Sequence, residues 1–237
     1  MDLTALTRGS DSAVVLGCGP SIRQIDADTE DMLDRVDTWS LNNFIIHPSI
    51  VPTFYHLEVK KHRNGALMRR LTKERREMYR DVCWILDKNR DYLLKYVRPE
   101  WYPRIYTYKK TYKAVDSGLY TPGGKPRVSC KCSLSIVLDI MARQGYTKIF
   151  LIGVDLFSSA YFWTDNPLYA DADIPELMRS CKPDERPVGA PHPTISMTTF
   201  IKGLGEHNNI EMINLSPQSM LADVIRTEDV RELHRVL

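Results

Sequence analysis

The stretch that decides the fold is Ala13-Val14-Val15-Leu16-Gly17-Cys18-Gly19-Pro20-Ser21-Ile22. It opens with four consecutive apolar residues that do not alternate with polar ones, which indicates a strand covered on both faces, as in a parallel sheet. The two glycines permit a left-handed backbone and the close approach of another molecule, and the proline suits the first turn of a helix. Because free N–H groups at a helix start attract phosphate, the stretch predicts a strand, a turn that cradles a nucleotide phosphate, and a helix.

The same pattern is also typical of an ordinary tight turn between a strand and a helix, and the local residues favour neither interpretation. The turn lacks the third glycine of a dinucleotide-binding fingerprint. It also lacks the Gly-Lys-Ser/Thr of a P-loop. An NAD-dependent enzyme and an ordinary nucleoside triphosphatase are therefore both disfavoured.

Composition and charge narrow the class of protein. The 32 basic and 30 acidic residues leave a formal net charge of +2, so the overall charge does not call for nucleic acid as a partner. The five cysteines are odd in number and are not spaced as paired metal ligands, which indicates a reduced, cytoplasmic protein. No apolar run approaches the ~20 residues that span a bilayer, whereas peripheral attachment to the inner face of a membrane stays open.

Apolar runs and helical periodicity alternate along the chain. Strands are expected at residues 37–41, 52–55, 83–86, 148–155 and 211–215, and helices at 21–36, 64–82, 87–97, 133–144 and 194–206. Ser21 is expected to cap the first of these helices, and a terminal helical segment is expected after Pro217. This alternation predicts an α/β fold, a Rossmann-like and mostly parallel sheet flanked by helices, with a small lid subdomain. Residues 157–191 lack periodicity and are expected to form the lid, between a core of residues 1–156 and a C-terminal part of that core at 192–237.

Polar side chains follow two of the expected strands at the point where each strand ends. Asn42 and Asn43 follow one strand, and His56 and Glu58 follow the next. Open α/β sheets bind ligands in the crevice outside the carboxyl ends of their strands, so these residues are candidates for a site. Asparagine is also favoured in ordinary turns, and that interpretation of Asn42 and Asn43 stays open.

Two segments carry patterns that nucleic-acid-binding proteins also use. Residues 69–76 read RRLTKERR, and tyrosines interleave with lysines over residues 102–113. The first segment could face nucleic acid or an acidic membrane, but a solvated helix face with Glu–Arg pairs is favoured. The second segment is interpreted as an edge strand and loop, because the chain is not strongly basic. No nucleic acid is expected as a partner.

Four stretches, in this order, resemble the bacterial sialyltransferases of glycosyltransferase family 42. They are Gly17-Cys18-Gly19-Pro20-Ser21 with Ile25-Asp26, then Asn42-Asn43-Phe44, then Gly145-Tyr146 through Ile149 to Gly153-Val154-Asp155, and finally Leu215-Ser216-Pro217-Gln218-Ser219-Met220-Leu221-Ala222. His192 falls between the last two stretches, where that family has its catalytic histidine ahead of a helix. Each motif is short, so the resemblance rests on their order and spacing.

The resemblance implies a Rossmann-like fold with a lid, a CMP-activated sialic acid as donor, a glycan as acceptor, inverting transfer without a metal ion, and a homo-oligomer. It implies that His192 is the general base, that Tyr161 donates a hydrogen bond to the leaving phosphate, and that Arg127 matches a conserved arginine. It further implies that the nucleotide is held by Gly17, Cys18, Gly19, Pro20, Ser21 and Asn42, with His56 at another nucleotide-contacting position and Ser133 at the donor's carboxylate or phosphate. An imidazole suits the role of a base near neutral pH.

Two further hypotheses stay open. Archaeal hydroxymethyl-dihydropterin pyrophosphokinases share the Gly-x-Gly-Pro-Ser turn and a Gly-x-Asp-Leu strand end, and such an enzyme uses Mg²⁺ and ATP. Cys18 and His56 stand where the sialyltransferases have asparagine, and Phe157 stands where they have a tyrosine, which keeps a nucleotide-binding module without turnover in view. Asp171-Ala172-Asp173 imitates a metal-binding Asp-x-Asp but lies in the expected lid, and Asp155 is expected to be a structural hydrogen-bond acceptor.

Overall fold

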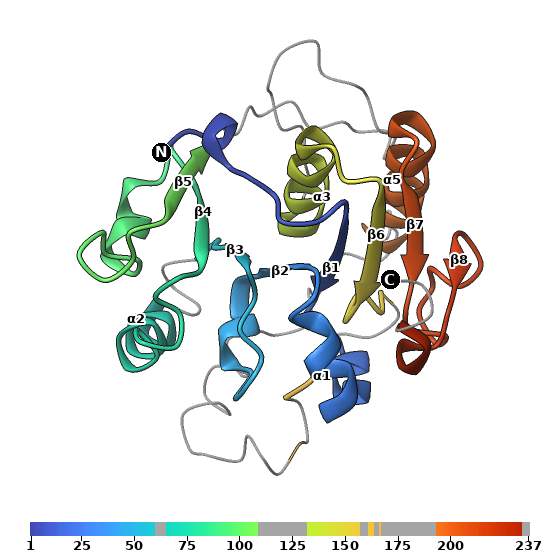
Figure 1. Ribbon diagram of the computed structural model, residues 1–237, viewed down its shortest axis with the longest axis horizontal. Coiled ribbons are helices and arrows are strands. Elements are labelled where there is room, and N and C mark those ends of the chain that lie inside the picture. The colour runs from blue at the N-terminus through green and yellow to red at the C-terminus, as the bar shows by residue number, and fades with distance from the viewer. Residues whose placement is uncertain (60–64, 109–131, 157–160, 164–165, 167–192, 234–237) are drawn as a thin grey trace, which may run out of the picture.

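The computed structural model describes all residues except 60–64, 109–131, 157–160, 164–165, 167–192 and 234–237. The described strands are β1 (Ser12–Leu16), β2 (Asp37–Leu41), β3 (Phe54–His56), β4 (Cys83–Asp87), β5 (Ile105–Tyr108), β6 (Lys148–Ile152), β7 (Glu211–Asn214) and β8 (Arg226–Thr227). They form one sheet in the order β5-β4-β3-β2-β1-β6-β7-β8, and every neighbouring pair is parallel (Figure 1). The α/β, Rossmann-like sheet predicted from the sequence is confirmed.

The strand order changes direction at β1. The chain adds β2 to β5 outward on one side of β1 and then returns to place β6, β7 and β8 on the other side. Leu16 is paired in register with Ser40 of β2 and with Ile152 of β6. Because the connections leave in opposite directions from the two sides of β1, the carboxyl ends of β1 and β6 flank the topological switch where open α/β sheets bind ligands.

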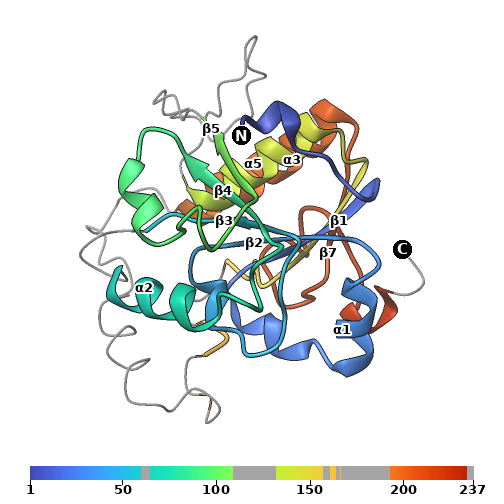
Figure 2. The ribbon, with the colours of Figure 1, turned by 60° about the vertical axis from the view of Figure 1, so that its left-hand side comes forward.

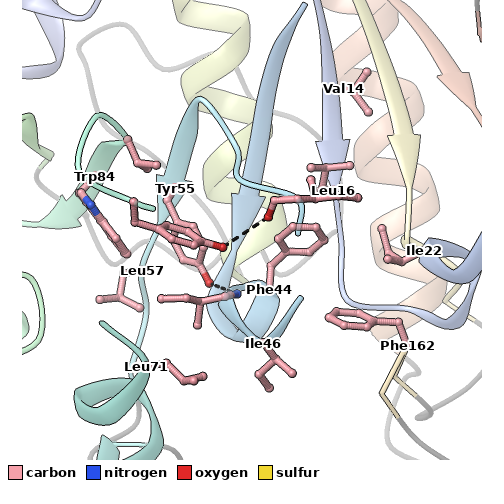
Figure 3. Close-up of a cluster of buried hydrophobic side chains, with 14 of the residues drawn as sticks. Val14, Leu16, Ile22, Phe44, Ile46, Tyr55, Leu57, Leu71, Trp84 and Phe162 are labelled. Carbon is pink, nitrogen blue, oxygen red and sulfur yellow. Dashed lines mark hydrogen bonds between the residues drawn. The ribbon is translucent and has the colours of Figure 1, made fainter. Parts of the chain in front are cut away.

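Buried side chains cover both faces of the sheet, which explains the unbroken apolar run in β1. Val14 and Leu16 join a cluster on one face, while Ala13 and Val15 join a second cluster on the other. The first cluster packs under α1 (Ala27–Leu33) and α2 (Gly65–Glu74), and Figure 3 shows its aromatic centre. The second packs under α3 (Ser133–Gln144) and α5 (Pro193–Asn208), which lie side by side over the sheet (Figure 2).

The two helices on the second face agree well with their predicted bounds. α3 spans the predicted residues and ends where Gly145 takes a left-handed conformation with φ of 81°, which a glycine adopts at little cost. α5 begins at Pro193, one residue before the predicted start. Both helices were predictable because each carries a sustained apolar face.

The first predicted helix, at residues 21–36, is wrong as a single element. The structure has a 3-10 helix at Pro20–Gln24 and then α1, whose start is capped by Asp26 through hydrogen bonds from the N–H and hydroxyl of Thr29. Ser21 was expected to cap the helix. Its Oγ instead accepts a hydrogen bond of 2.9 Å from the N–H of Gly153, at the end of β6.

Other elements also differ from the prediction, and β6, expected over 148–155, ends at Ile152. α2 ends at Glu74, eight residues before the expected end, and turns follow it. Residues 87–97, expected to be a helix, contain the last residue of β4 and a 3-10 helix at Asp91–Lys95. The C-terminal segment, expected to be helical, contributes β8 and a 3-10 helix at Val230–Glu232. The division into core and lid stays a prediction, because most of residues 157–191 lie outside the described part.

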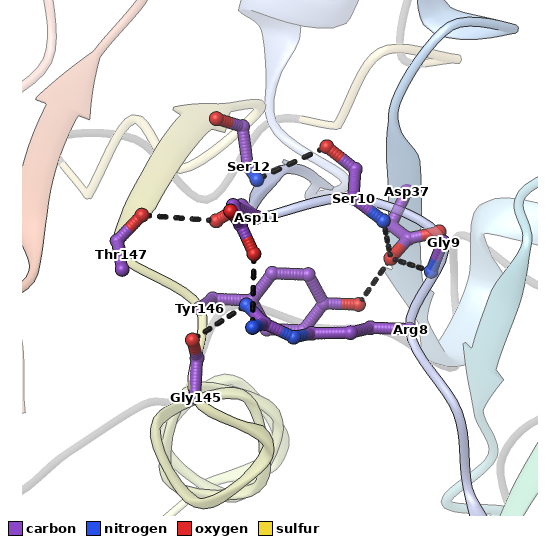
Figure 4. A network of polar contacts seen from close by, with 9 residues as sticks. All are labelled: Arg8, Gly9, Ser10, Asp11, Ser12, Asp37, Gly145, Tyr146 and Thr147. Atoms are coloured by element: carbon purple, nitrogen blue, oxygen red, sulfur yellow. Dashed lines mark hydrogen bonds and ion pairs between the residues drawn. The ribbon is translucent and has the colours of Figure 1, made fainter.

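A polar cluster closes the amino edge of the sheet (Figure 4). The Asp37 carboxylate accepts hydrogen bonds from the N–H groups of Gly9 and Ser10 and from the Tyr146 hydroxyl at 2.7 Å. Burial raises the pKa of Tyr146, so its hydroxyl stays protonated and can donate to Asp37 while accepting from Trp39 Nε1 at 3.1 Å. This cluster ties the first residues, β2 and the turn before β6 together at the edge opposite the carboxyl ends of the strands.

The protonation of His47 should contribute to the pH dependence of the unfolding free energy. Its Nδ1 accepts from the N–H of Ile50, its ring stacks on Phe44 at 5.4 Å, and burial, followed by the charge of Arg75, lowers its pKa from 6.5 to about 4. The unfolded chain therefore protonates at higher pH than the folded one, so this contribution to the unfolding free energy declines as the pH falls from 6.5 toward 4. We expect the unfolding free energy of His47→Gln, measured by urea denaturation, to fall less than that of the native chain when the pH is lowered from about 7 to about 5. Equal losses would contradict the assignment.

Candidate functional site

The glycine turn after β1 is packed directly against the end of β6. The N–H of Gly17 donates to the carbonyl of Ile152 at 2.8 Å, and the N–H of Gly19 donates to the carbonyl of Gly153 at 2.8 Å. A Cβ on Gly17 would lie 2.2 Å from the Gly153 oxygen, and one on Gly19 would lie 2.1 Å from Asp155 Oδ2. The two turn glycines do not have positive φ, so their role is close approach between two strand ends and not the left-handed backbone that we expected.

Asp155 occupies the helix start that was predicted to receive a phosphate. Its carboxylate is 4% exposed and accepts hydrogen bonds from the N–H of Ser21 at 3.0 Å and from the hydroxyl of Ser216 at 2.7 Å. The N–H groups of Gly17, Gly19 and Ser21 thus all donate to protein acceptors. These three amides therefore support the ordinary-turn interpretation, a nucleotide contact at this turn stays a prediction, and Asp155 accepts the structural hydrogen bonds that were expected of it.

Asp155→Ala should measure how much this contact contributes. The substitution leaves the buried donors of Ser21 and Ser216 without an acceptor, and each such donor costs about 1–3 kcal/mol. We expect the free energy of unfolding in urea to fall by about 3 kcal/mol. Asp155→Asn keeps one carbonyl oxygen and should lose roughly half as much; a larger loss from Asn than from Ala would contradict this account.

Tyr161 is held beside the glycine turn by its neighbours. The N–H of Phe162 donates to the carbonyl of Cys18 at 3.0 Å, and Arg23 Nε donates to the carbonyl of Phe162 at 2.7 Å. The half-buried ring of Tyr161 stacks on the buried ring of Trp163, with centroids 4.5 Å apart and planes 3° apart. The predicted phosphate-contacting tyrosine therefore lies next to the predicted nucleotide-binding turn.

A chain of polar contacts extends along the carboxyl edge from β2 toward β4. The hydroxyl of Ser133 lies 3.2 Å from Asn42 Oδ1 and 2.6 Å from Glu58 Oε2, and Arg90 forms an ion pair of 2.8 Å with Glu58. Cys18 Sγ lies 3.6 Å from the carbonyl of Leu41, which joins this chain to the glycine turn. The structure thus brings Asn42 and Ser133 together, although they are far apart in the sequence.

Asn42 is fixed by its backbone as well as by its side chain. Its φ is 54°, a left-handed conformation that asparagine tolerates better than most residues. Its carbonyl accepts a hydrogen bond from the buried Tyr55 hydroxyl, which also accepts from the N–H of Ile45. The two interpretations of Asn42 are therefore compatible: the residue forms a turn, and that turn places its side-chain amide beside the Ser133 hydroxyl.

Glu58 and Arg90 complete the polar chain; the sequence placed Glu58 among the site candidates without a specific role, and it did not point to Arg90. Glu58 was noted as a polar residue after a strand, whereas Arg90 lies three residues after the end of β4 and was missed because that segment was taken for a helix. The rule of looking for polar side chains after each strand would have found it. Glu58 places a negative charge directly against the Ser133 hydroxyl.

His56 lies deeper than the other predicted nucleotide contacts. Its side chain is 0% exposed, and its Nε2 lies 2.9 Å from the Tyr108 hydroxyl across the sheet. A contact between His56 and a nucleotide stays a prediction.

Comparison with known proteins identifies solved structures that have a similar fold. No family model and no curated protein sequence matches the chain. Among solved structures, the chain superposes on the monofunctional α-2,3-sialyltransferase Cst-I from Campylobacter jejuni with a TM-score of 0.57 and 13% identity, over 95% of this chain and 82% of that one. It superposes on the sialyltransferase CstII from Campylobacter jejuni, bound to the substrate analogue CMP-3FNeuAc, with a TM-score of 0.51 and 14% identity, over 91% and 85% of the two chains. The chain has the sialyltransferase fold.

A further solved structure with this fold contains an acceptor as well as a nucleotide. It is CstII in complex with a trisaccharide acceptor and CMP, with a TM-score of 0.51, 14% identity, and coverage of 90% of this chain and 84% of that one. At such identities the likeness concerns the fold and leaves the residue roles to be tested.

Several predicted features lie outside the described residues. His192 and Arg127 are among them, although α5 begins at Pro193, immediately after His192 in the sequence. The Asp171-Ala172-Asp173 segment also lies outside. Within the part of the chain that the structure describes, no three His, Cys, Asp or Glu residues are grouped as metal ligands, and no helix is long and apolar enough to cross a membrane.

Proposed function

We propose that this chain is a glycosyltransferase that transfers sialic acid, or a related nonulosonic acid, from a CMP-activated donor to a glycan acceptor. The observation that carries the proposal is that a chain with the sialyltransferase fold gathers its glycine turn, Asn42, Ser133 and Tyr161 on the carboxyl edge at the topological switch. That edge is where the fold class binds nucleotides. The acceptor is proposed to be a surface glycan of the lipooligosaccharide type, decorated by a cytoplasmic homo-oligomer at the inner face of the membrane.

The proposed reaction is a single inverting displacement that needs no metal ion. His192 takes the proton from the acceptor hydroxyl while that oxygen attacks the anomeric carbon of the donor, and the bond to the CMP phosphate breaks. Tyr161 donates a hydrogen bond to the leaving phosphate, and Arg127 adds positive charge there. The nucleotide is bound by Asn42 and by the outer surface of Cys18, Gly19 and Pro20. These three turn residues are partly exposed, so a ligand can reach them.

One assay tests the proposal against the other hypotheses. Purified protein is incubated with CMP-sialic acid and a panel of glycan acceptors, and CMP release and product mass are measured with and without EDTA. The proposal predicts acceptor-dependent release that EDTA does not abolish. A requirement for ATP and Mg²⁺ would favour a pyrophosphokinase instead. CMP binding in calorimetry without release, under every acceptor condition, would identify a module without turnover.

Glu58 should weaken the binding of anionic ligands in this crevice. Its carboxylate lies 2.6 Å from the Ser133 hydroxyl, which we propose meets the donor's carboxylate or phosphate, so the two anions compete for one donor. We expect Glu58→Gln to bind CMP about tenfold more tightly in calorimetry. Glu206→Gln, the same change at an exposed position on α5, should leave the affinity unchanged. Unchanged or weaker binding by Glu58→Gln would contradict the placement of the anion at Ser133.

A further inference from the structure

A polar pocket lies between α2 and residues 94–100, at the end of the 3-10 helix Asp91–Lys95 and just after it. Its volume is about 360 Å³, and it is lined by Arg69, Leu94, Lys95, Arg98, Pro99 and Glu100. None of these residues belongs to the polar chain at the carboxyl edge. The pocket therefore needs an explanation separate from the proposed transferase site.

The lining of this pocket carries an excess of positive charge. Three of the lining residues, Arg69, Lys95 and Arg98, are cationic, and one, Glu100, carries a carboxylate. Within the part of the chain that the structure describes, none of the three cations forms an ion pair, whereas Arg70 and Arg76 of the same basic segment pair with Glu74 and Glu77. Like charges around one small pocket repel each other unless an anion lies between them.

Aromatic rings hold the two arginines in place. The Arg69 guanidinium lies over the Tyr96 ring, 5.9 Å from its centroid, and the Arg98 guanidinium lies over the Trp101 ring at 4.9 Å. A guanidinium resting on a ring face keeps its N–H edge available to a ligand, and that planar edge matches two oxygens of a phosphate. Because Tyr96 is buried and Trp101 is half-buried, the rings are themselves fixed by the core.

We propose that this pocket binds a phosphate group through Arg69, Lys95 and Arg98. The phosphate is carried either by a soluble ligand or by the headgroup of an anionic lipid. The lipid source has one supporting feature, Leu94, whose side chain is 41% exposed beside the cations and can contact an apolar surface next to a headgroup. The site is independent of the transferase reaction, so either proposal can fail without the other.

The test uses two matched double variants of the full chain. Arg69→Gln with Arg98→Gln removes the two guanidiniums of the pocket, and Arg76→Gln with Arg80→Gln removes two exposed arginines that follow α2 and lie outside the pocket. Both variants lose the same charge. Binding is measured with inorganic phosphate and glycerol 1-phosphate by calorimetry at low salt, and by sedimentation with phosphatidylcholine vesicles with and without phosphatidic acid.

We expect the pocket variant to bind phosphate at least about tenfold more weakly, and the control variant to change less than about twofold. Loss in calorimetry assigns a soluble ligand, and loss only with phosphatidic acid vesicles assigns a lipid headgroup; either supports the site. A third variant, Arg69→Lys with Arg98→Lys, keeps the charge but removes the planar edge, and should also bind more weakly than the native chain. The proposal is overturned if neither probe binds, if both Gln variants lose affinity equally, or if the Lys variant binds as the native chain does.

Discussion

Gly17→Ala is expected to destabilise the protein by about 3 kcal/mol or more, because the added methyl group would meet main-chain atoms that cannot move aside. The nearest atoms are the carbonyl oxygen and carbon of Gly153, at 2.2 and 2.6 Å. Relief requires separating β1 from β6, whose pairing is continuous up to Leu16 and Ile152. The measurement is the free energy of unfolding in urea.

Gly145→Ala is the matched control for this substitution. Gly145 has φ of 81° and nothing within 4 Å of an added Cβ, so the same chemical change brings backbone strain without a clash. We expect it to cost about 1 kcal/mol. Losses of equal size at the two positions would show that close approach between the strand ends is not what requires glycine at position 17.

His192→Ala is expected to lower the rate of CMP release by about 10²–10⁴-fold while leaving CMP affinity unchanged. The reason is that the proposed base acts on the acceptor hydroxyl and does not hold the nucleotide. In the native protein the proposed mechanism predicts a rate that rises with pH as the imidazole loses its proton, and this limb of the pH profile should vanish in the variant. Stopped assays over a range of pH, with calorimetry of CMP, give both quantities.

His207→Ala supplies the control, because His207 is an exposed histidine in the last turn of α5. The rate and the pH profile of this variant should match those of the native protein. Full activity of His192→Ala would eliminate the proposed mechanism. A parallel loss of CMP binding would reassign His192 to holding the nucleotide.

Much of the fold could be predicted because its signals are local. β1, β6 and α3 have unbroken apolar runs or a sustained apolar face, and both patterns survive in any context. β8 was missed because its two residues, Arg226 and Thr227, form a strand only through pairing with Ile213 and Asn214. The first helix was misjudged because the partner of Ser21 is Gly153, a contact that no local pattern contains.

Part of the candidate site's arrangement could be predicted from the sequence. Asn42 follows β2 at the carboxyl edge, as the strand-end rule predicts, whereas Ser133 meets it from the start of α3 and was indicated only by the resemblance. The turn amides could not be assigned from sequence, since their acceptors lie on β6 and beyond it. Glu58 shows the same limit, because its charge matters only through Ser133, which the fold brings to it from the start of α3.

The central position of β1 has a consequence for how the chain folds. β1 can pair with β2 as soon as both have been made, but its other edge stays open until β6 has been synthesised. Contacts between such distant segments form slowly, and an exposed apolar strand edge invites association with other chains. We therefore expect fragments that stop before residue 148 to aggregate, and the candidate site at the carboxyl edge to be among the last parts of the molecule to assemble during synthesis.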